Sequence, residues 1–134
     1  MISSDPQYTD PALAVIKRYD PETYAMIVAD DSWHVTVTDD VTPGTDATTR
    51  VSKYASERDT KISPAAIRGS ATQIIDVPVT DYLASIIVHE YEHHVEGLPW
   101  EHNAYVASVN FDVKLPGSDD AILRSDYHRL RTEN

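Results

Sequence analysis

The chain contains no cysteine, which excludes disulfide bonds and thiolate metal ligands. Basic residues are also scarce, because 11 Lys and Arg stand against 22 Asp and Glu and give a formal net charge of −11. Nucleic-acid binding needs clustered basic side chains, so we expect none. No apolar stretch approaches the roughly 20 residues of a membrane-spanning helix, and the first residues lack the features of a signal peptide. We therefore expect a cytoplasmic protein that does not bind membranes.

Length and element order predict an α+β fold. The 134 residues suffice for one hydrophobic core, so we expect one domain over residues 1–134. Proline after aspartate marks two helix starts, and alternating β-branched residues mark strands. The segment 55–69 matches neither the helix pattern nor the strand pattern. The predicted elements are helices from Asp10-Pro11 to about 19 and from Asp20-Pro21 to about 29, strands 32–38, 48–54 and 72–77, the two helices described below, and a final helix over 118–131.

The most informative motif is H-E-x-x-H at residues 89–93. Residues four apart lie on one side of a helix, so His89 and His93 can present two imidazoles to one metal ion. Glu90 projects beside them, where its carboxylate can reach a water bound to that metal. Zinc lowers the pKa of such a water, and Glu90 would then act as the general base. The motif predicts a zinc site for hydrolysis.

The motif stands on a predicted buried helix. Residues 81–88 are apolar on nearly every side, Thr80 or Asp81 can cap the helix start, and Gly97 falls where a left-handed residue would end it. A second helix is expected from Pro99, through the segment 100–113.

A short connection between these two helices would turn the chain back over the metal. The first turn of the second helix then carries Glu101 to the two histidines as a third ligand. The adjacent His102 is the rival for that position, since zinc also accepts imidazole. The sequence leaves this choice open.

At these residues the chain resembles the zincin metallopeptidases of the gluzincin type, in which a glutamate on the following helix completes the metal site. The matching residues are the motif 89–93 and Glu101-x-x-Ala104-Tyr105, and the pattern is similar to small ImmA/IrrE-like zincins over about residues 72–116. The resemblance implies a minimal zincin-like domain that binds one zinc ion through His89, His93 and Glu101, with Glu90 as the base. Asn103 departs from the pattern, since related zincins often have a second glutamate there.

The expected function is that of a zinc-dependent endopeptidase acting on a peptide or protein substrate. An extended substrate would pair with an edge strand beside the metal helix, and 72–77 or 33–38 are the candidates. The oxyanion needs a donor besides the metal, for which Tyr105, Tyr127 and His128 are candidates. Two alternatives remain open. The fold could be a catalytically silent binding or regulatory module, or His102 could close a structural zinc site.

The remaining histidines and tryptophans are expected to be structural or superficial. We expect His94 to be an ordinary surface residue on a solvated helix end, together with Glu92 and Glu96. His34 is also expected at the surface of its strand. Trp33 and Trp100 are predicted to lie in the core or in a cleft wall.

Overall fold

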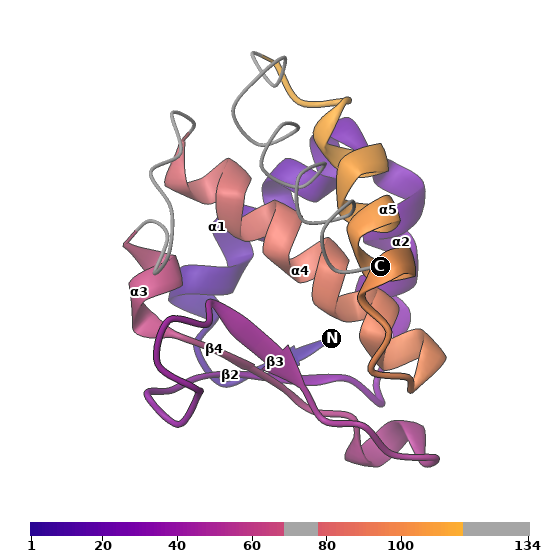
Figure 1. Cartoon of the computed structure of the whole chain (residues 1–134). Helices are drawn as coiled ribbons and strands as arrows, with labels where there is room; N and C mark the ends of the chain where they lie inside the picture. Colours follow the sequence, from indigo (N-terminus) through magenta and orange to yellow (C-terminus); the bar gives the residue numbers. More distant parts are fainter. Residues whose placement is uncertain (69–77, 117–134) are drawn as a thin grey trace.

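The computed structural model describes residues 1–68 and 78–116, and this part of the chain has the predicted α+β architecture (Figure 1). Five α-helices, a short 3-10 helix and a four-stranded mixed sheet follow one another along it. The predicted strand 72–77 and the predicted helix 118–131, which contains Tyr127 and His128, lie outside the described residues.

Two N-terminal helices, α1 (Pro6–Tyr19) and α2 (Pro21–Ala29), open the fold. The predicted bounds of the second helix are confirmed, and the Asp20 carboxylate accepts a hydrogen bond from the Thr23 backbone N–H 3.3 Å away. The predicted start of the first helix is wrong. Pro6 occupies the first turn, where a proline is tolerated, and the helix continues through Pro11 although that residue has no N–H to donate.

The sheet has the order β1-β2-β4-β3, formed by β1 (Ile2–Ser3), β2 (His34–Val37), β4 (Thr60–Ile62) and β3 (Ala47–Thr49). β2 pairs in parallel with β1 and β4, whereas β3 pairs antiparallel with β4. The prediction that 33–38 forms the edge is therefore wrong, because β2 has a partner on each side. The edge of the described sheet that contacts α4 is β3, which is shorter than the strand predicted there.

The segment that the pattern left unassigned contains three short elements: the 3-10 helix η1 (Ala55–Glu57), β4 and α3 (Pro64–Ile67). These elements lead to the motif helix, α4 (Val79–Glu96), which is followed by α5 (Glu101–Asp112). The helix start at Val79, with Pro78 in the capping position, makes the predicted Thr80 and Asp81 caps wrong.

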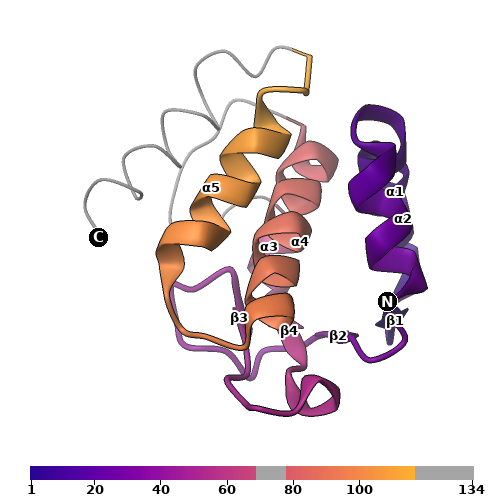
Figure 2. The ribbon, with the colours of Figure 1, turned by 90° about the vertical axis from the view of Figure 1, so that its right-hand side faces the viewer.

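Helix α4 lies at the centre of the molecule, between α5 and the α1–α2 pair (Figure 2). Four of its buried apolar residues, Leu83, Ala84, Ile87 and Val88, belong to a core shared with the other helices and the sheet. Trp33 is fully buried there, as predicted. Trp100 was predicted to lie in the core or in a cleft wall, and its exposure of 66% excludes the core. None of the helices within the described ranges has the length and apolar character needed to cross a membrane.

Candidate metal centre

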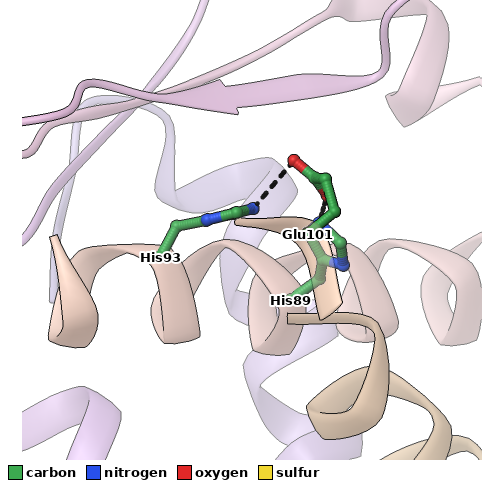
Figure 3. A group of neighbouring side chains, drawn as sticks. All are labelled: His89, His93 and Glu101. Carbon is green, nitrogen blue, oxygen red and sulfur yellow. Dashed lines mark hydrogen bonds and ion pairs between the residues drawn. The ribbon is translucent and has the colours of Figure 1, made fainter. Parts of the chain in front are cut away.

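Three potential metal ligands meet between α4 and α5. His89 and His93 come from consecutive turns of α4, and Glu101 comes from the first turn of α5. One Glu101 oxygen lies 3.0 Å from His89 Nε2, and the other lies 3.1 Å from His93 Nε2. The three side chains point toward one another (Figure 3). The site is partly buried, since His93 is 8% exposed while His89 and Glu101 are intermediate.

The turn between the helices positions these groups. Gly97 ends α4 with a φ of 69°, a left-handed conformation that favours glycine, and its N–H donates to the His93 carbonyl. The next residue, Leu98, places its carbonyl oxygen 3.1 Å from His93 Nδ1. An imidazole that donates from Nδ1 to this carbonyl presents Nε2 to the site, which is the usual support for a metal-binding histidine.

Opposite charges stabilise each other in this cluster. Burial disfavours the charged form of His93, but its hydrogen bond to Glu101 and the negative charges of Glu90 and Glu101 prevail and raise its pKa to about 9. Burial likewise disfavours ionised Glu101, yet hydrogen bonds from His89 and His93 lower its pKa to about 2. In the metal-free protein at neutral pH, a proton on His93 therefore balances the Glu101 carboxylate.

The donor set fits zinc. Two imidazole nitrogens and a carboxylate oxygen are common zinc ligands, and one atom from each residue lies within 4.8 Å of the others. Tetrahedral coordination at roughly 2.0–2.1 Å would place ligand atoms about 3.3 Å apart. The two histidine–glutamate distances, which involve different Glu101 oxygens, are close to this value. Three protein ligands leave a fourth position for water or substrate, as in catalytic zinc sites. The rival ligand His102 is exposed and does not belong to the group found in the described part of the chain.

Glu90 lies beside this group and is 5% exposed. The Thr49 hydroxyl, from the edge strand β3, donates to Glu90 Oε2 at a distance of 2.7 Å. Sequence reasoning missed Thr49. It was predicted only as part of a strand, and no local pattern connects it with a glutamate 41 positions later. The structure thus places the candidate base between the ligand helix and the edge of the sheet.

The other side of α4 carries a second polar network, centred on His94. This residue is 1% exposed, so the prediction of a surface position is wrong. Its Nδ1 lies 2.9 Å from the Arg58 carbonyl and its Nε2 lies 3.0 Å from the Ser32 hydroxyl. Asp30, which is 3.5 Å from Nε2, also accepts a hydrogen bond from Tyr91, and burial together with this acidic partner raises the Tyr91 pKa to about 12. The neighbouring residues His93 and His94 therefore make their contacts on different sides of α4.

Of the predicted oxyanion donors, only Tyr105 lies in the described residues. It is buried on α5, and its ring centroid is 4.7 Å from that of His89. It therefore borders the metal group. The expected surface position of His34 is confirmed, since its side chain is 49% exposed.

Comparisons with protein families, with curated proteins and with solved structures find no match for this chain. The candidate site is therefore defined by its own geometry, which combines a group that could hold a metal ion, an adjacent carboxylate and the end strand of the sheet formed by the described residues.

Proposed function

We propose that this protein is a zinc-dependent metallopeptidase that cleaves internal peptide bonds. The observation that carries the proposal is the convergence of His89, His93 and Glu101 at one point, with the buried Glu90 carboxylate next to them. A site of three ligands with one open position is typical of catalytic zinc, whereas structural zinc sites are closed by four protein ligands.

Each residue has a defined task in this proposal. His89, His93 and Glu101 hold the zinc ion, which when bound polarises the scissile carbonyl and makes water more acidic. Glu90 accepts a proton from the attacking water on its carboxylate and then donates that proton to the leaving amine. Tyr105 is the described candidate for a further donor to the carbonyl oxygen.

The sheet edge favours an extended peptide as the substrate. β3 is the last strand of the described sheet, so its backbone groups on the side away from β4 can pair with an added strand. β3 also contacts α4, and its Thr49 contacts Glu90 directly. A peptide added at this edge would therefore run past the metal ligands. We therefore assign substrate pairing to β3, in place of the candidates 72–77 and 33–38 that the sequence suggested.

The test combines metal analysis with cleavage of an unstructured protein such as casein. Glu90→Gln removes the base at nearly constant volume, and Glu92→Gln, on the same helix, is the matched control. We expect one zinc per chain in the wild type and both variants. Cleavage should fall by about 100-fold or more in Glu90→Gln alone, because general base catalysis contributes roughly 10²–10⁴-fold.

Other results would identify the alternatives. Zinc in all three proteins without any cleavage would favour a catalytically silent binding module. Wild-type protein that takes up no zinc would contradict the metal site itself. Equal activity in Glu90→Gln and the wild type would remove Glu90 from the mechanism.

A further inference from the structure

A chain of three hydrogen bonds leads from the protein core to Glu90. The Trp33 Nε1–H donates to Thr60 Oγ1 at 2.8 Å, the Thr60 and Thr49 hydroxyls lie 2.6 Å apart, and Thr49 Oγ1 lies 2.7 Å from Glu90 Oε2. Trp33 and Thr60 are at most 1% exposed. The four residues come from the segment before β2, from β4, from β3 and from α4, so the hydrogen bonds connect two strands of the sheet with the motif helix.

The chemistry of the four groups fixes the direction of every bond. An indole N–H can only donate, so the Thr60 oxygen must accept from Trp33. An ionised carboxylate can only accept, so the Thr49 hydroxyl must donate its single proton to Glu90. The remaining bond then runs from Thr60 to Thr49. A longer contact of 3.4 Å, from Thr49 Oγ1 to the Glu90 carbonyl oxygen, competes only weakly.

We propose that Thr49 is a positioning residue for Glu90, and that the hydroxyl chain anchored at Trp33 holds the carboxylate in its working orientation. The inference rests on the proposed peptidase function. The Thr49 hydroxyl takes one of the two acceptor positions of Oε2, and we assign the proton from water to the other carboxylate oxygen, Oε1. Hydrogen bonds in such a series polarise one another, so loss of one weakens the rest.

The arrangement also couples the base to substrate binding. Thr49 belongs to β3, the strand at which the proposed substrate pairs, and its side chain reaches across to α4. A peptide that pairs with β3 fixes the position of this strand. The base is thereby held in place by the same strand that receives the scissile segment.

Three variants test the inference. Thr49→Val keeps the side-chain volume but removes the hydroxyl, and Thr49→Ser keeps the hydroxyl but removes the methyl group. Thr36→Val, at an exposed position of β2, is the control for a threonine-to-valine change in the same sheet. In each protein, zinc content, kcat and KM for casein-derived peptides, and the NMR signals of the indole N–H groups are measured.

The protein has two tryptophans, so the indole signal of one can serve as the reference for the other in the same NMR spectrum. The Trp33 indole signal reports on the hydroxyl chain, and the signal of the exposed Trp100 should not respond. We expect Thr49→Val to retain zinc, to lower kcat by about 10–100-fold at unchanged KM, and to shift the Trp33 signal upfield. Thr49→Ser should restore both properties, and Thr36→Val should change neither.

The results separate this inference from the peptidase proposal. A Trp33 signal that does not respond to Thr49→Val overturns the hydroxyl chain, whatever the activity. Full kcat in zinc-loaded Thr49→Val, or equal loss in Thr49→Ser, overturns the positioning role. If no protein cleaves peptides but the Trp33 signal responds to both Thr49→Val and Glu90→Gln, the hydroxyl chain is supported and the peptidase proposal fails.

Discussion

Zinc affinity should depend steeply on pH because zinc and a proton compete for His93. Zinc binds the neutral imidazole, whereas Glu101 and Glu90 raise the pKa of this histidine to about 9 in the metal-free protein. Below that pH the proton must leave before zinc binds. Half of the His93 side chains are already neutral at pH 9 and only about one in a hundred at pH 7. Lowering the pH from 9 to 7 should therefore cost about 2.3 kcal/mol, or about 50-fold in affinity.

The measurement is a zinc titration in competition with a chromophoric chelator over this pH range, corrected for protonation of the chelator. Calorimetry in buffers of different ionisation enthalpy should show release of about one proton per zinc at neutral pH. Glu101→Gln is the informative variant. This change removes a candidate zinc ligand and also the main cause of the raised His93 pKa. The variant should therefore bind zinc more weakly than the wild type, and its zinc affinity should depend less on pH. A wild-type affinity that is constant between pH 7 and 9 would refute the reasoning.

Three further predictions concern stability, each measured by thermal or denaturant unfolding. Without metal, the raised pKa of His93 stabilises the folded state by at most about 3 kcal/mol. This contribution is fully present below the ordinary pKa of histidine and is lost as the pH rises through about 9. In EDTA, the free energy of unfolding should therefore fall over this pH range. Gly97→Ala should cost about 1–3 kcal/mol, since φ is 69° and an added Cβ would lie 2.5 Å from the Arg58 guanidinium, and unchanged stability would contradict this. Thr60→Val should cost about 1–3 kcal/mol by leaving the buried Trp33 N–H without its acceptor, an effect that a control Thr36→Val should not reproduce.

The ligand group was largely predictable because its geometry is local. The four-residue spacing of His89 and His93 determines their common side of a helix, and Gly97 marks where that helix ends. A short connection to a second helix then brings Glu101 back toward the histidines. These inferences need only helix periodicity and chain reversal, and the structure places the three residues together as expected.

The surroundings of the ligand group were not predictable because they depend on distant segments. His94 was expected at the surface, yet its partners Ser32 and Arg58 precede it by 62 and 36 positions. One of the two candidate edge strands, 33–38, was wrong for the same reason. β2 has the strongest alternating pattern, but that pattern says nothing about which strands lie beside it. The strand that became the edge has three residues and left only a weak signal.

The two networks on α4 have a consequence for how the protein can move. His93 is bound on the side of α5 and Leu98, whereas His94 is bound on the side of Ser32 and Arg58. Rotation of the helix about its axis, or a slide along it, would break both sets of contacts at once. The spacing of the candidate ligands is therefore preorganised, and we expect any rearrangement to occur in the sheet margin and in the connection between α4 and α5. We expect hydrogen exchange to be slow along the centre of α4 and faster in β3, so that the least mobile part of the molecule carries the metal ligands.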